Sequence, residues 1–152
     1  MKRRAVVSWV LVVLWACFIF FMSAHTGNQM DTGILGQLKQ FLANVLNAAF
    51  GYHDDPVSPL GHFLEYTVFG VLLANALRHH MSPSRACLIA IACASAYGIT
   101  DEFHQLFVPE RACDPADWLT DTCGAALGAA LVYVTMRARG AKSRKRDART
   151  GR

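Results

Sequence analysis

The chain has 152 residues, of which 53% are hydrophobic and 17% are charged. This length allows one domain, and such a composition is unusual for a soluble protein of this size, so a membrane protein is the better class. The net charge is +4, but the basic residues cluster beside apolar segments, which favours contacts with membrane lipids over nucleic-acid binding.

The first apolar segment spans residues 5–22 and contains no charged residue; Lys2, Arg3 and Arg4 precede it. It is longer than the apolar region of most signal peptides. A cleavage after Ala24 would also place Met22 where a small residue is needed. We therefore predict a retained membrane-spanning helix.

An amphipathic segment follows at residues 32–50. Apolar residues recur there at helical spacing, Asp31 or Thr32 can cap the helix, and Gly51 ends it. We expect this helix to lie in the membrane interface or to pack over the bundle, and a partner-binding role is the alternative.

Three further membrane spans are predicted from apolar runs that have helix-start signals before them. Ser58–Pro59, Ser82–Pro83 and Asp114–Pro115 are these signals, and Pro109 stops the third span. The expected fold is all-α, an integral membrane four-helix bundle with an extra amphipathic helix in the first outer loop. The predicted spans are residues 5–22, 59–77, 84–108 and 115–136.

Residues 1–136 are expected to form the membrane domain, and residues 137–152 a disordered, basic cytoplasmic tail. With four spans, 13 of the 15 Lys and Arg residues fall on one side, which places both termini in the cytoplasm. Five cysteines without a CxxC pair argue against a zinc knuckle or a disulfide scaffold. A disulfide between Cys113 and Cys123 stays open.

Carboxylates from three predicted spans lie at similar depth. At about 1.5 Å per residue, Glu65 and Asp121 lie roughly 9 Å inside the starts of their helices, and Asp101 roughly 12 Å before Pro109. Because polar faces of membrane helices point inward, we expect these faces to meet in an outward-facing polar pocket. A small-xxx-small pattern from Gly124 to Gly128 predicts close approach of the fourth span to a neighbour.

This pocket allows several kinds of chemistry. Its residues can act as general acid and base, grip an amine, hydroxyl or lipid head group, or bind a divalent metal. No compact metal-binding motif is present, so we assign no metal ligands and identify no cofactor. A purely structural network with Arg111 and the histidines is the alternative, and Asp114 and Asp117 also suit capping and first-turn positions. The candidate acid–base or ligand-binding residues are Glu65, Asp101, Glu102 and Asp121, and the candidate binding residues are His62, Tyr66, Gln105, Arg111 and Asp117.

Two segments, GHFLEYTVFGVLLANAL and DEFHQLFVPERACDPADWLTDTCGAALG, resemble the signature segments of the VanZ-like family of small bacterial membrane proteins. Asp121 stands where the family often has Asn, Glu110 where it usually has Gly, and the Lys often found before the His is absent. The matching positions are His62 and Tyr66, then Asp101, Glu102, Gln105, Phe107, Pro109 and Arg111, then Asp117, Gly124 and Gly128.

The resemblance covers residues 9–131 and implies a multi-pass protein of the bacterial cytoplasmic membrane, linked to resistance against the glycopeptide teicoplanin. The partners it implies are membrane lipids and an envelope precursor or glycopeptide-related ligand. It brings no catalytic mechanism. Two functions therefore stay open: binding or processing of an envelope lipid or wall precursor, and a noncatalytic membrane interaction module.

Overall fold

The computed structural model describes residues 2–24, 33–52, 57–109, 111 and 113–150. In these ranges the chain is helical, with short connections and no strand. The helices are α1 (Lys2–Ser23), α3 (Gly33–Phe50), α4 (Val57–Leu77), α5 (Pro83–Gln105) and α6 (Pro115–Thr150).

Four of these helices are long and apolar enough to cross a membrane: α1, α4, α5 and the Pro115–Lys142 part of α6. The predicted all-α membrane bundle is therefore confirmed, and the chain is a multi-pass membrane protein. Two of the predicted start signals are also confirmed, because α5 begins at Pro83 after Ser82 and α6 begins at Pro115 after Asp114. The third span ends at Gln105, three residues before the predicted limit.

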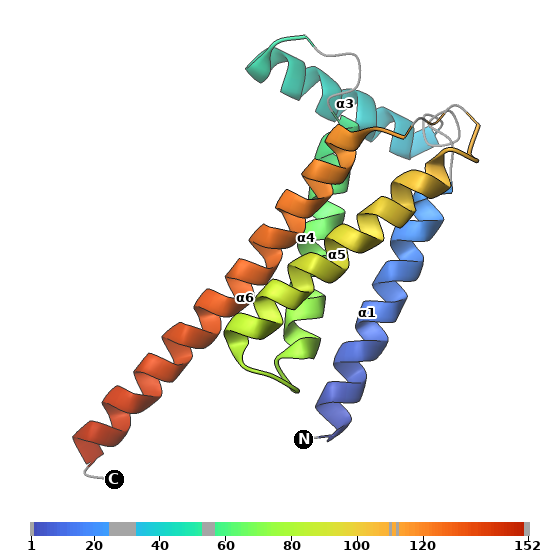
Figure 1. Ribbon diagram of the computed structural model, residues 1–152. Helices are drawn as coiled ribbons and strands as arrows, with labels where there is room; N and C mark the ends of the chain where they lie inside the picture. Colours follow the sequence, from blue (N-terminus) through green and yellow to red (C-terminus); the bar gives the residue numbers. More distant parts are fainter. Residues whose placement is uncertain (1, 25–32, 53–56, 110, 112, 151–152) are drawn as a thin grey trace.

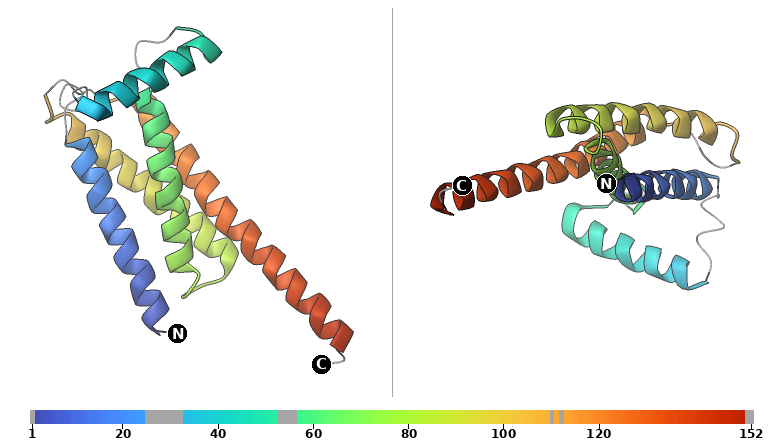
Figure 2. Two further views of the ribbon diagram at one scale, coloured as in Figure 1. Left: turned by 180° about the vertical axis from the view of Figure 1, so that it is seen from behind. Right: turned by 90° about the horizontal axis from the view of Figure 1, so that it is seen from below.

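The membrane-spanning helices run lengthwise, and α3 crosses one end of the bundle (Figure 1). The start of α4, the end of α5 and the start of α6 lie at this α3 end, while both termini and the α4–α5 connection lie at the opposite end (Figures 1 and 2). The arrangement agrees with four antiparallel spans, and it brings the polar ends of α4, α5 and α6 together.

Helices α4 and α6 form the most extensive contact of the bundle. Glycines make it possible: a Cβ atom at Gly128 would collide with the carbonyl oxygen of Thr67, and one at Gly124 with that of Phe63. From the other side, a Cβ atom at Gly70 would meet the carbonyl oxygen of Ala125. The two backbones therefore touch directly, as the small-xxx-small pattern predicted. We call these three residues the glycine contact.

Helix α1 is held to the bundle by side-chain hydrogen bonds. Trp15 Nε1 donates to the carbonyl oxygen of Glu65 on α4 at 2.9 Å. The Tyr97 hydroxyl of α5 donates to the carbonyl oxygen of Ala16 at 2.8 Å. Nearer the N-terminus, Asn75 Nδ2 donates to Ser8 Oγ at 3.2 Å. Because such groups lack competing water in a membrane, these bonds fix how α1 sits against α4 and α5.

Helix α3 is the amphipathic helix in the first loop. It begins and ends at glycines with positive φ, Gly33 at 70° and Gly51 at 95°, a conformation that other residues rarely adopt. Its apolar residues Ile34, Leu38 and Phe41 are exposed. An exposed apolar stripe on a helix that crosses the end of a membrane bundle suits the interfacial position that the sequence suggested.

The C-terminal segment differs from the expectation. We expected residues 137–152 to be a disordered tail, whereas α6 continues without a break to Thr150. The reason lies in the composition of the segment, because Ala, Arg and Lys are strong helix formers and can extend a helix that the membrane has already nucleated.

Candidate functional site

The first part of the site comes from α4. His62 and Tyr66 lie one turn apart, so they share a helix face. The Tyr66 side chain is fully buried, and the side chain of His62 is only 11% exposed. This face points at α5 and α6, as the helical spacing predicted.

The second part comes from the last turn of α5. Asp101, Glu102 and Gln105 are all buried there. Glu102 Oε2 accepts a hydrogen bond from the backbone N–H of Asp114 at 2.8 Å, and Glu102 Oε1 accepts one from Gln105 Nε2 at 3.4 Å. Glu102 therefore joins the end of α5 to the start of α6, and its carboxylate is held in one orientation.

The third part is Asp121, which lies near the second turn of α6 and is completely buried. Its Oδ1 atom is 3.1 Å from His62 Nδ1, so the imidazole N–H can donate a hydrogen bond across the α4–α6 interface. The glycine contact begins three residues later at Gly124, and the close approach of the backbones there brings His62 and Asp121 within reach of each other.

Four of the predicted residues converge on one point. His62, Asp101, Glu102 and Asp121 each offer a ligand atom, and these four atoms lie within 4.8 Å of one another. They come from three helices and from positions 59 residues apart in the chain. No local motif could have revealed this grouping, because each helix contributes only one or two of its members.

Several polar atoms of the site have no hydrogen-bond partner among the described residues. They are Asp101 Oδ1, Asp121 Oδ2 and the Tyr66 hydroxyl. Tyr66 is fully buried one turn after His62 on α4. Buried polar atoms in proteins are nearly always paired, and exceptions often mark a functional site.

The remaining predicted residues lie around this centre. Glu65 is half-buried on α4 and interacts electrostatically with His62, Asp101 and Asp121, but it is not one of the four converging groups. Arg111, half-buried in the α5–α6 connection, acts on Asp101 and Glu65 through its charge. Asp117 occupies the first turn of α6, outside the convergence.

Two neighbours of the site were not predicted. Ser23, buried at the end of α1, lies beside Asp101. Gly98 lies beside Asp121: a Cβ atom there would be 3.2 Å from Asp121 Oδ2. A single glycine within a membrane span carries no signal of this role in the sequence. The position of Gly98 one turn before Asp101 is a signal only once the helix faces are known.

The cysteines take no part in the site. Cys113 and Cys123 are both exposed, and the structure shows no disulfide between them. Asp114, as its capping pattern indicated, accepts a hydrogen bond from the backbone N–H of Ala116 at 2.8 Å through its Oδ1 atom.

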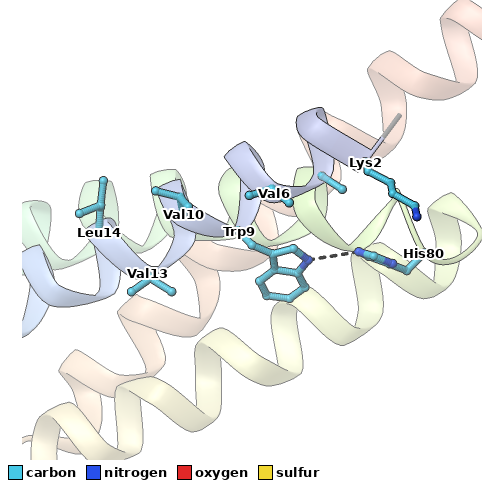
Figure 3. A pocket seen from close by; sticks show the side chains of 8 residues that line it. Lys2, Val6, Trp9, Val10, Val13, Leu14 and His80 are labelled. Atoms are coloured by element: carbon cyan, nitrogen blue, oxygen red, sulfur yellow. Dashed lines mark hydrogen bonds between the residues drawn. The ribbon is translucent and has the colours of Figure 1, made fainter.

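A separate hollow of about 610 Å³ lies at the opposite end of the bundle, between α1 and the α4–α5 connection (Figure 3). Trp9 Nε1 donates to His80 Nε2 at 3.2 Å beside it. The wall is otherwise mostly aliphatic, with exposed Val6, Val10 and Leu14. We interpret it as lipid-facing surface, because most of the side chains that line it are apolar and exposed.

Comparison with known proteins supports the resemblance seen in the sequence. A family model described as VanZ/LLP1 matches residues 8–136, which include all of α4 and α5, most of the α1 and α6 spans, and all residues of the site. No curated protein and no solved structure matches the chain.

Proposed function

Because the chain belongs to the VanZ/LLP1 family, we propose that it binds or processes a lipid-linked component or wall precursor of the bacterial cell envelope at the site of α4, α5 and α6. In this proposal the protein resides in the cytoplasmic membrane, and its action on the envelope underlies the link to glycopeptide, specifically teicoplanin, resistance.

The observation that carries the proposal is the convergence of His62, Asp101, Glu102 and Asp121 within membrane-spanning helices. Ionisable groups at membrane depth are unfavourable, and where they occur they usually serve a substrate or ion. The unpartnered oxygens of Asp101 and Asp121 are available to an amine or hydroxyl of a ligand.

The chemistry of an envelope precursor suits these side chains. Imidazole and carboxylate groups held close together can exchange protons with a bound hydroxyl or amine, in the manner of a general acid and base. Arg111, half-buried in the α5–α6 connection, is the cation proposed to contact an anionic group of the ligand. Glu65, Tyr66, Gln105 and Asp117 surround these residues and complete the proposed binding surface.

We assign the α3 end to the outside of the cell. Lys2, Arg3 and Arg4, the loop from Arg78 to Arg85, and the basic residues after Met136 then face the cytoplasm, in agreement with the distribution of positive charge in membrane proteins. In this orientation the site opens toward the outer leaflet, where wall precursors are used.

A noncatalytic role for the same residues is the competing function. It is favoured by the hydrogen bonds of His62 with Asp121 and of Glu102 with Asp114, which connect different helices. In that case the acidic residues would stabilise the bundle, and α3 or the basic end of α6 would recruit a partner.

Conservative substitutions separate the two functions. We expect expression of the chain to raise teicoplanin resistance, and Asp101→Asn and Glu102→Gln to abolish this gain at unchanged protein level and thermal stability. Asp114→Asn, which removes a nearby charge and keeps the helix cap, is the control and should retain resistance. Loss of the folded protein in both variants would instead support the structural network.

A further inference from the structure

We propose that His62, Asp101, Glu102 and Asp121 form a binding site for one divalent first-row transition-metal ion, of which Mn²⁺ and Zn²⁺ are the appropriate probes. This inference does not depend on the proposed envelope ligand, because it concerns what the four side chains bind when the protein is alone.

The first support is the spacing of the four ligand atoms, which lie within 4.8 Å of one another. With metal–ligand bonds of about 2.0–2.2 Å, the ligands of a tetrahedral ion are about 3.4 Å apart, and ligands on opposite sides of an octahedral ion are about 4.2 Å apart. The cluster is therefore slightly wider than a closed coordination shell. Binding an ion therefore requires the ligand side chains to move closer together around the carboxylate of Glu102, which Asp114 and Gln105 already orient.

The second support is independent of that spacing. Asp121 is completely buried and Asp101 is 4% exposed, yet Asp121 Oδ2 and Asp101 Oδ1 have no hydrogen-bond partner in the described part of the chain. An ionised carboxylate in such surroundings is strongly unfavourable unless a cation or a hydrogen-bond donor compensates it. A divalent ion bound by the cluster would compensate the charge of both carboxylates.

Charge balance points the same way. Three carboxylates meet in the cluster, and His62 is hydrogen-bonded to one of them, Asp121. Arg111 also acts on Asp101 through its charge, but it belongs to the half-buried α5–α6 connection rather than to the converging groups. A 2+ ion with a neutral imidazole leaves a site of small net charge, which is the least unfavourable state at this depth.

The ligand set selects the class of metal. Three carboxylates alone would suit Mg²⁺ or Ca²⁺, whereas an imidazole nitrogen favours first-row transition metals. No cysteine is part of the group, which argues against a thiolate site. Glu102 is already oriented by the backbone N–H of Asp114 and by Gln105, the kind of outer hydrogen bonding that metal-ligating carboxylates usually have.

Direct metal binding tests the site. The full chain, purified in detergent and stripped with a chelator, is equilibrated with Mn²⁺ or Zn²⁺, and bound metal is measured by mass spectrometry after removal of free ion. We expect one ion per chain. We also expect X-ray absorption of the zinc form to show nitrogen and oxygen ligands only. Absence of binding by the folded protein, or a sulfur ligand, would overturn the proposal.

Substitutions of the proposed ligands test whether the ion binds at this site. Asp121→Asn and Asp101→Asn should each weaken binding at least tenfold, and Asp114→Asn, which keeps all four ligands, should bind as the parent does. Circular dichroism and gel filtration check that each variant is folded. If either aspartate variant fails to fold, the binding of metal to His62→Gln is measured instead. Equal binding by all folded variants would show that the metal is held elsewhere and would refute the assignment.

Discussion

At the scale of single residues, the start of α6 shows how similar side chains acquire different roles from their positions. Asp114 is exposed and caps the helix, Asp117 is half-buried in the first turn, and Asp121 is fully buried against His62. The three acids are spaced by three and four residues, so they share one helix face. The three residues have the same side-chain chemistry, so their different burial along α6 decides which one caps the helix and which one belongs to the site.

The cap of α6 gives a prediction for stability. Asp114→Ala removes the acceptor of the Ala116 N–H and should destabilise the protein by about 0.5–2 kcal/mol, while Asp114→Asn should have a much smaller effect because Asn also caps helices. Unfolding in a detergent titration measures both. Equal losses for the two variants would show that the negative charge matters rather than the cap.

The candidate site was predictable from the sequence only in part. Helical spacing placed His62 and Tyr66 on one face of α4, and the stop at Pro109 placed Asp101 near the end of α5. Hydropathy and spacing could not show which carboxylates form hydrogen bonds. That depends on the geometry between helices, as in the contact of Glu102 with the backbone of Asp114.

At the scale of the helices, the fold was predictable because the membrane imposes simple rules on apolar length and backbone hydrogen bonding. The start signals before Pro83 and Pro115 and the glycine pattern of α6 were correct in the structure. The C-terminal part of α6 was not, because a polar segment that continues a helix shows no amphipathic pattern of its own. Its Ala, Arg and Lys residues favour a helix, whereas its high net charge suggested disorder.

The glycine contact gives the prediction at this scale. Gly128→Leu should separate α4 from α6 and destabilise the protein by about 3 kcal/mol or more, because the new side chain meets the backbone of Thr67 and not a side chain that can move. The matched control is Gly61→Ala in α4, where a Cβ atom would meet nothing within 4 Å and helix propensity should rise. Thermal unfolding in detergent compares the two, and a Gly128→Leu variant as stable as the parent would contradict the direct backbone contact.

At the scale of the whole molecule, the four spans divide the chain into two ends with different properties. The α3 end holds the carboxylates, the imidazole and an amphipathic helix, and the opposite end holds most of the positive charge. The mostly aliphatic hollow near Trp9 lies at the basic end, opposite the α3 end that holds the acidic site. This difference in charge between the two ends favours one orientation of the protein in the membrane.

Cysteine labelling tests that orientation. Cys113 is exposed in the α5–α6 connection and should react with a membrane-impermeant maleimide in intact cells. Ser82→Cys, exposed in the α4–α5 connection, should react only after the membrane is permeabilised. A Cys113→Ser variant identifies the signal of the native thiol. The reverse pattern would invert the proposed orientation.

The origin of the site in three helices also bears on how the protein is made. His62, Asp101 and Glu102 are synthesised before Asp121, which reaches them only when α6 has entered the membrane. Until then α4 and α5 carry ionisable side chains without their partner helix, a state that a bilayer disfavours. Stable insertion of α4 and α5 therefore depends on the helix that follows them, so these three spans are expected to enter the membrane as a cooperative unit.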